Sequence, residues 1–358
     1  MPNRLRIFFN YRTVASPWGG ANSFLRSLQA ALAADPEIEI IADENAEYDV
    51  FFLNQLYRGP GRPRLGRKFL SILQLRRLHN TGTTNLWRAV SRRFTRRPLR
   101  PPAIVCRLVN HAQHAYGKAD RKQVNLFRAL LYTTADIFQT HYQHEIFQAA
   151  GYVKPDPTII NNGVDQLVFH PRGRIVWRPG QPLVVFSSAM SRLRTKRFDL
   201  ISALSLLPGV ESYHAGLWPD DVPLRQVRLL GPLGHEEMAG FFREKAHVFM
   251  HPSEKDNCPN AVLEAMSCGL PVFFSRLGGT AELAEAYGVA LDEGVEPALR
   301  RMKEGYGRMQ ASVQQRHDYF SIVRVAAEYK AVFRQAAEAR SLMGATAFAT
   351  GGNELLIP

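Results

Sequence analysis

The stretch AHVFMHPSEKDNCPNAVLEAMSCGLPVFFSR, residues 246–276, places a helical pattern between two short apolar runs. The apolar runs are typical of strands that are buried on both faces of a sheet. Between them, Asp256 and Asn257 offer capping oxygens, Pro259 suits a first helical turn and Gly269 ends the helix. A strand, a helix and a second strand in this order predict a parallel βαβ unit.

The two sides of this predicted helix differ in character. At about 100° per residue, one side forms an apolar stripe of Pro259, Val262, Leu263, Met266 and Leu270. The opposite side carries Asn260, Ala261, Glu264, Ser267 and Cys268, with no lysine or arginine. A solvated helix face usually carries long charged side chains, so we expect this side to line a cleft. The alternative is a helix between two layers, with Glu264 in a structural hydrogen bond.

Length and composition favour two domains. The chain has 358 residues, of which 46% are hydrophobic, and this length exceeds what one core usually supports. Neither a long hydrophobic run nor a signal-peptide pattern is present, so we expect a cytoplasmic protein. Three cysteines, Cys106, Cys258 and Cys268, have no regular spacing. They therefore favour neither a disulfide scaffold nor a zinc site, and nothing supports a thiol nucleophile.

One segment carries the whole excess of positive charge. Residues 58–100 contain 13 lysines and arginines and no acidic residue, whereas 32 basic and 32 acidic residues balance elsewhere. Within residues 86–97, Trp87 lies on an apolar helical face and Arg88, Arg92 and Arg96 lie on the opposite one. This pattern is typical of a helix on an anionic membrane surface, or of a lipid-linked acceptor site. A solvated basic surface and a polyanion site are alternatives, although no nucleic-acid-binding module is recognisable and we expect no nucleic acid as a partner.

Strand-like and helix-like runs alternate along most of the chain. This alternation predicts two doubly wound α/β domains with parallel sheets, joined by a linker rich in proline and glycine near residues 155–181. We expect an N-terminal domain over residues 1–160 and a C-terminal domain over residues 161–315. Residues 316–358 should form helices that cross back to the first domain, followed by a loose tail. After Gly288 we expect mostly helix.

Polar motifs follow the predicted strands at their carboxyl ends, where ligands bind in such sheets. Gly19 and Gly20 open a helix after the first strand and suit the approach of an anion, or only a tight turn. Arg192, Arg194 and Lys196 follow another strand and suit a diphosphate, although such a cluster is equally typical of solvated surface.

The motifs in this order resemble retaining glycosyltransferases of the GT-B fold, in particular the large group 1, or family 4, class. IINNGVDQLVFHP is similar to the family's hinge motif, and SRLRTKRFDLISAL is similar to its GR…KG.D.LI.A segment. The stretch VRLLGPLGHEEMAGFFREKAHVFMHPSEKDNCPNAVLEAMSCGLPV resembles the segment that ends in E…EAMA.G.PV, and WGGANSF resembles the N-terminal diglycine turn.

The resemblance implies a role for each matching residue. Glu264 would hydrogen-bond the ribose of a nucleotide sugar. Lys196, with Arg192 or Arg194, would clamp the diphosphate, and Leu233 lies in the loop whose backbone reads the base. The backbone amides around Asn257, Asn260 and Ala261 would also hold the donor. Pro259 cannot contribute to this set, because it has no N–H.

Two positions depart from the family pattern. Asp256 stands where the family has a glutamate that contacts the donor sugar, and Arg197 stands where it has glycine. The shorter carboxylate puts sugar preference, and full activity, in doubt. The resemblance also implies a histidine near the donor sugar in the first domain. His111, His114, His141 and His144 are candidates, and we favour His111 because it follows a strand most closely.

We therefore predict a metal-independent retaining glycosyltransferase that needs no cofactor besides its substrate. The donor would be a UDP- or GDP-type sugar, and the acceptor an envelope glycan or a lipid-linked acceptor. The protein would be cytoplasmic and able to bind the inner face of the membrane as a peripheral protein. The alternatives are a nucleotide-sugar epimerase of the same fold and a non-catalytic glycosyltransferase-like binding subunit.

Overall fold

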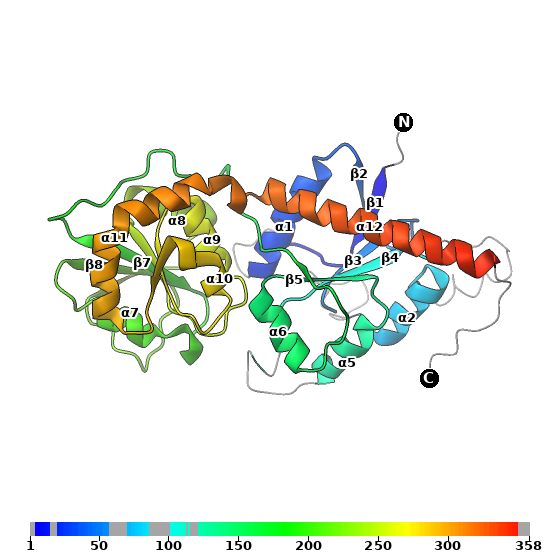
Figure 1. Cartoon of the computed structure of the whole chain (residues 1–358), viewed down its shortest axis with the longest axis horizontal. Coiled ribbons are helices and arrows are strands. Elements are labelled where there is room, and N and C mark those ends of the chain that lie inside the picture. The colour runs from blue at the N-terminus through cyan, green and yellow to red at the C-terminus, as the bar shows by residue number, and fades with distance from the viewer. Residues whose placement is uncertain are drawn as a thin grey trace.

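The computed structural model describes residues 4–14, 20–56, 70–85, 101–111, 114 and 121–349, with only the backbone of residues 121–123 and 343–349. Two six-stranded parallel sheets form its framework (Figure 1). The first has the order β2-β1-β3-β4-β5-β6 and the second β12-β11-β10-β7-β8-β9. The strands are β1 (Leu5–Phe9), β2 (Ile38–Ile41), β3 (Val50–Asn54), β4 (Ala103–Arg107), β5 (Ala135–Phe138), β6 (Thr158–Ile159), β7 (Leu183–Ala189), β8 (Val210–Gly216), β9 (Val227–Gly231), β10 (Val248–His251), β11 (Val272–Phe274) and β12 (Gly288–Ala290).

Helices connect the strands and cover the sheets, so the predicted doubly wound α/β class is confirmed. The first sheet carries α1 (Gly20–Ala33), α2 (Ile72–Thr81), α5 (Arg121–Leu130) and α6 (His141–Ala149). The second carries the short η1 (Arg194–Lys196), α7 (Phe198–Leu204), α8 (His235–Glu244), α9 (Asn260–Ser267), α10 (Thr280–Ala284), η2 (Glu285–Tyr287) and α11 (Val295–Gln315). The chain then continues through η3 (His317–Phe320) into α12 (Ile322–Ala349).

The long helix α12 leaves the second sheet and packs against the first (Figure 1). Val325, Tyr329 and Phe333 are fully buried in the core that β1, β3 and α1 form. The ring of Phe333 meets the ring of Phe52 edge to face at 5.3 Å. The last helix that the structure describes is therefore part of the first core, while the exact domain boundaries stay a prediction.

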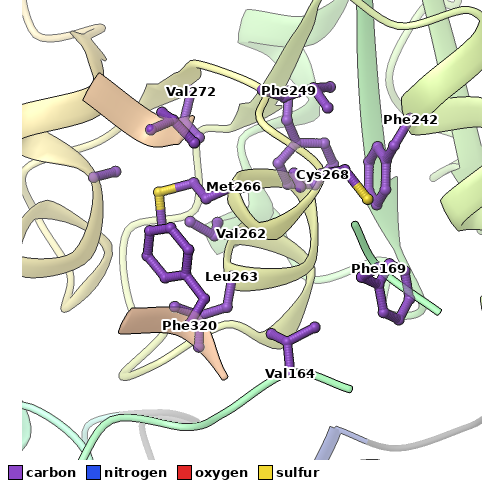
Figure 2. Close-up of a cluster of buried hydrophobic side chains, with 14 of the residues drawn as sticks. Val164, Phe169, Phe242, Phe249, Val262, Leu263, Met266, Cys268, Val272 and Phe320 are labelled. Carbon is purple, nitrogen blue, oxygen red and sulfur yellow. The ribbon is translucent and has the colours of Figure 1, made fainter. Parts of the chain in front are cut away.

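The helix α9 is central to the second core (Figure 2). Val262, Leu263, Met266 and Leu270 are at most 1% exposed, which confirms four of the five positions of the predicted apolar stripe, whereas the fifth, Pro259, lines the cavity. Figure 2 shows Met266 and Leu263 directed towards Phe320 of η3. The opposite side is divided, because Ser267 and Cys268 are buried in the core, whereas Asn260, Ala261 and Glu264 line a cavity between the domains.

The predicted start of α9 is wrong in detail. Pro259 is the N-cap and has no side-chain capping bond. Asp256 and Asn257 do not cap the helix, because their side chains are engaged elsewhere: Asp256 pairs with Lys196, and Asn257 donates to the carbonyl of Val109 in the other domain. The capping residues that the pattern suggested therefore belong to the cleft.

The region after Gly288 is mostly helical, as expected, but it begins with a short strand, β12, before α11 and α12. This strand has three residues and pairs with β11 at the sheet edge. A Cβ at Gly288 would lie 2.0 Å from the carbonyl oxygen of Val272, so only glycine fits there. Such a short strand has no alternating pattern for sequence analysis to detect.

The basic segment is described only over residues 70–85, which contain α2. The predicted amphipathic helix at residues 86–97 lies outside the described residues. In the part of the chain that the structure describes, no helix combines the length and the apolar character that a bilayer span requires.

Candidate functional site

A cavity of about 620 Å³ lies between the two domains, at the carboxyl ends of both sheets. Its walls include α1, β4 and the linker on one side, and η1, β10 and α9 on the other. The structure brings together eight of the predicted site residues in its lining: Gly20, Lys196, Leu233, Asp256, Asn257, Asn260, Ala261 and Glu264. The expectation of a crevice between two doubly wound domains is therefore met by the geometry.

Lys196 and Asp256 form a close ion pair in this cavity. The Nζ atom of Lys196 lies 2.5 Å from Oδ2 of Asp256, and their side chains are 19% and 28% exposed. Nε2 of His251 lies 2.8 Å from the same carboxylate oxygen. Burial alone would raise the pKa of Asp256, but the His251 hydrogen bond and the Lys196 charge outweigh it and hold that pKa far below its usual range. The carboxylate is therefore ionised at neutral pH.

Arg197, which stands where the family pattern has glycine, adopts a backbone conformation that glycine favours. Its φ and ψ are 53° and 51°, in the left-handed region that favours glycine. Two carboxylates hold its side chain: Asp199 accepts from Nη2 at 2.9 Å, and Glu254 accepts from Nη1. Arg197 is therefore paired outside the cavity lining.

Glu264 projects from α9 into the cavity and also borders an adjoining hollow of about 650 Å³. Burial raises the pKa of its carboxyl group to about 7. No side-chain hydrogen bond or ion pair to this carboxyl group is found among the described residues. The structural hydrogen bond that we considered for Glu264 is therefore absent within that part of the chain, and the group is placed to meet a ligand.

Four predicted site residues do not join this lining. Arg192 pairs with Asp220 at 3.5 Å and Arg194 with Asp221 at 3.4 Å, and both arginines are more than half exposed. His111 is buried against the rings of Phe127 and Phe147. Gly19 lies outside the described residues. Burial lowers the pKa of His111, and the Nδ1 atom of His111 has no partner in the described structure. The roles of these residues stay predictions.

The remaining candidate histidines are also placed away from the cavity lining. His114 contacts the hydroxyl of Tyr142 at 2.7 Å through Nε2. His144 is buried against Phe138 and Tyr152. The histidines in the lining are His235 and His251, neither of which we predicted. His251 is the last residue of β10, so the rule that polar residues at strand ends form the site could have found it.

Arg107, at the end of β4, is a second cavity residue that sequence analysis missed. It is 1% exposed and donates to side-chain oxygens of Asn54, Gln139 and Asn162 at 2.7–2.9 Å. Asn162 in turn donates to Asn260 at 2.8 Å, so the network connects the first sheet to α9.

Further hydrogen bonds join the two domains around the cavity. Asn260 donates to the carbonyl of Gly20 at 2.9 Å, and Ser23 lies 3.1 Å from Nε2 of His235. The Glu282 carboxylate accepts from the backbone N–H groups of His141 and Tyr142 at the start of α6. An acid at this position is favourable because the N-terminus of a helix is electropositive. Glu282 therefore acts as an interdomain contact in this structure.

The three cysteines are buried and unpaired, and burial raises the pKa of Cys258 to about 12. They are therefore thiols at neutral pH. Within the described ranges, no group of three or more His, Cys, Asp or Glu side chains is arranged to hold a metal ion.

The sequence of the second domain matches a known family. Residues 167–299 match the model described as "Glycosyl transferases group 1". The chain is 35% identical over 88 residues to a component of the human phosphatidylinositol N-acetylglucosaminyltransferase. It is 32% identical over 123 residues to the D-inositol 3-phosphate glycosyltransferase of Pseudarthrobacter chlorophenolicus. These alignments cover 22% and 33% of this chain and only 18% and 29% of those proteins.

Solved structures extend the likeness to nearly the whole chain. Sucrose-phosphate synthase from Thermosynechococcus elongatus superposes with a TM-score of 0.63 and 17% identity, covering 94% of this chain and all of that one. Anabaena HepE in complex with UDP and glucose superposes with a TM-score of 0.60 and 14% identity, covering 93% of this chain and all of that one. The two-domain arrangement is therefore the GT-B fold, as the sequence predicted.

Proposed function

We propose that this protein is a glycosyltransferase of family 4 that transfers a sugar from a UDP- or GDP-type donor with retention of configuration. The observation that carries the proposal is the placement of Lys196, Asp256 and Glu264 around one interdomain cavity. All three lie inside the segment that matches the group 1 family model. The complex of HepE with UDP and glucose supports a nucleotide sugar as the ligand class.

In the proposed reaction, the diphosphate lies against Lys196 and the ribose hydroxyls lie against Glu264. The bond between the sugar and the diphosphate ionises, and the departing phosphate oxygen accepts the proton of the attacking acceptor hydroxyl. The Lys196 ammonium stabilises the charge on that phosphate, a role that protein cations fill well in a partly buried site. Catalysis then requires positioning and electrostatics and no metal ion.

We further propose an envelope glycan or a lipid-linked acceptor at an anionic membrane surface. One relative is by name a transferase that acts on phosphatidylinositol. On the first domain, α2 packs beside α5, and Leu73, Val124 and Leu131 on these segments are 70%, 54% and 75% exposed. Exposed apolar side chains beside a basic segment suit a membrane surface.

Arg88, Arg92 and Arg96 lie outside the described residues, and their joint replacement by glutamine should weaken binding to anionic vesicles. Unchanged binding would remove this part of the proposal.

A thermal-shift panel with UDP, GDP, ADP and their common sugars tests the proposed donor class. A ligand that binds only the folded state raises its stability by about 2.7 kcal/mol at 100 times its Kd. We expect a clear shift with one base and none with the others. No shift with any of them would favour a non-catalytic binding protein.

The stereochemistry and metal independence have separate tests. Proton NMR of the first product should show an anomeric centre with the configuration of the donor. Activity should survive an excess of EDTA. An inverted product, or activity that EDTA abolishes and Mg²⁺ restores, would contradict the proposal.

A further inference from the structure

The carboxylate of Asp256 pairs with Lys196, the cation to which the proposed function assigns the donor diphosphate. Lys196 and His251 both approach Oδ2 of Asp256, at 2.5 Å and 2.8 Å. All three residues line the cavity. A diphosphate that binds Lys196 must therefore approach a carboxylate that already neutralises this lysine.

No other basic residue of the same loop lines the cavity in the structure. Arg192, Arg194 and Arg197 are paired with acids outside the cavity lining, at Asp220, Asp221 and Asp199. Of the four basic residues in the Arg192–Arg197 loop, Lys196 is the one that lines the cavity. The charge of Asp256 therefore acts directly on the loop's one cavity cation.

The backbone around the pair is fixed at several points. The N–H of Glu254 donates to the carbonyl of Thr195 at 3.0 Å, which ties the two loops together. The N–H of Gly279 donates to the carbonyl of Asp256 at 2.9 Å. The loop of Lys196 and the loop of Asp256 are therefore joined through the backbone, independently of the ion pair between the two side chains.

We propose that Asp256 is the internal counter-anion of Lys196, which the donor diphosphate displaces from the lysine while His251 retains the carboxylate. This inference rests on the proposed function, because it takes a nucleoside diphosphate as the ligand. The ammonium group of Lys196 carries a single positive charge, which cannot neutralise both Asp256 and a diphosphate. The two anions therefore compete for it.

The proposal predicts an unusual result for one substitution. Asp256→Asn removes the charge that competes with the ligand, so it should bind the nucleoside diphosphate more tightly than the wild type, by roughly tenfold. Transfer should nevertheless become slower, because the family resemblance assigns this position to the donor sugar. An acid that only helps to bind the donor would give the opposite change in affinity.

Calorimetric titration of UDP, GDP and ADP into the wild type, Asp256→Asn and Asp256→Ala tests the proposal. Asp256→Ala shows whether tightening comes from loss of the charge or from a new amide hydrogen bond, and we expect both variants to bind more tightly. Asp292→Asn is the matched control, because it removes a carboxylate that pairs with Arg276 at the surface. We expect its affinity to equal that of the wild type. Thermal unfolding without nucleotide verifies that each variant is folded.

A double variant separates competition from simple repulsion. In a Lys196→Ala background there is no ammonium group to compete for, so most of the gain from Asp256→Asn should disappear. An equal gain in both backgrounds would overturn the proposal, and so would unchanged or weaker binding by the single variants. If the wild type binds none of the three nucleotides, the proposed function itself fails; if it binds one and the variants do not bind it more tightly, only the inference fails.

Discussion

At the scale of single residues, Glu264 is a half-buried cavity residue, and desolvation raises the pKa of its carboxyl group to about 7. The folded-state pKa lies above the unfolded value of about 4.3. Burial of this group therefore costs no stability well below pH 4, where both states are protonated. The cost grows as the pH rises through the unfolded pKa towards 7, and it is complete above pH 7.

Glu264→Gln should consequently stabilise the protein at pH 8 by about 2–3 kcal/mol, and by much less at pH 5. Glutamine has nearly the same shape and no charge, so the change isolates the ionisation. Urea unfolding at the two pH values measures the difference. An equal effect at both values would show that ionisation of Glu264 does not contribute to stability.

Arg197 offers a second test at this scale. Because its backbone is left-handed, a glycine at this position should give a more stable protein than an alanine, the reverse of the usual order. Both Arg197→Gly and Arg197→Ala lose the pairs with Asp199 and Glu254. Alanine also retains the cost of a positive φ, about 1 kcal/mol. We therefore expect the glycine variant to be more stable by about that amount in denaturant unfolding. An alanine variant of equal or greater stability would contradict this account of the loop.

At the scale of elements, α12 is a C-terminal helix that stabilises the N-terminal core. Phe333 is fully buried there, whereas Val323, on the same helix, is 70% exposed. Phe333→Ala should lower the free energy of unfolding by about 3–5 kcal/mol, the usual cost of removing a buried aromatic ring. Val323→Ala should have almost no effect.

Hydrogen exchange shows which strands lose stability in Phe333→Ala. Faster exchange is expected in β1, β3 and β4, and little change in β10 and β11, because the ring packs only in the first core. Loss of protection in β10 and β11 alone would contradict the packing of α12 on the first domain.

The repeated strands and helices could be predicted from the sequence because each long element has its own periodicity. Contacts between residues far apart in the sequence could not. The pairing of Asp256 with Lys196 within the second domain, and of Glu282 with the start of α6 between the domains, joins residues that are 60 and about 140 positions apart. Asp256 also looks like a helix cap in sequence, since aspartate is a preferred capping residue. His251 and Arg107 were not predicted because they are the last residues of β10 and β4, whereas the polar motifs that indicated the site lie in the loops after the strands.

At the scale of the whole molecule, the approach of the two domains depends on Gly279. A Cβ there would lie 1.9 Å from the carbonyl oxygen of Asn257 and 3.0 Å from Oγ1 of Thr140 in the other domain. Gly279→Ala should therefore displace the loop of Asn257, open the cleft and enlarge the radius of gyration. Gly240→Ala is the control, because its Cβ would meet no atom within 4 Å. Small-angle scattering identical to that of the wild type would show that closure tolerates the methyl group.

In the proposed function, Lys196 supplies the charge that lets a nucleotide sugar react in this cavity. The most direct measurement of this role is the release of nucleoside diphosphate from UDP- and GDP-sugars, with and without acceptor glycans, by the wild type and by Lys196→Ala. We expect turnover with at least one donor and a loss of at least about 100-fold in the variant. Turnover that survives the substitution, or none with any donor, would contradict this role of Lys196.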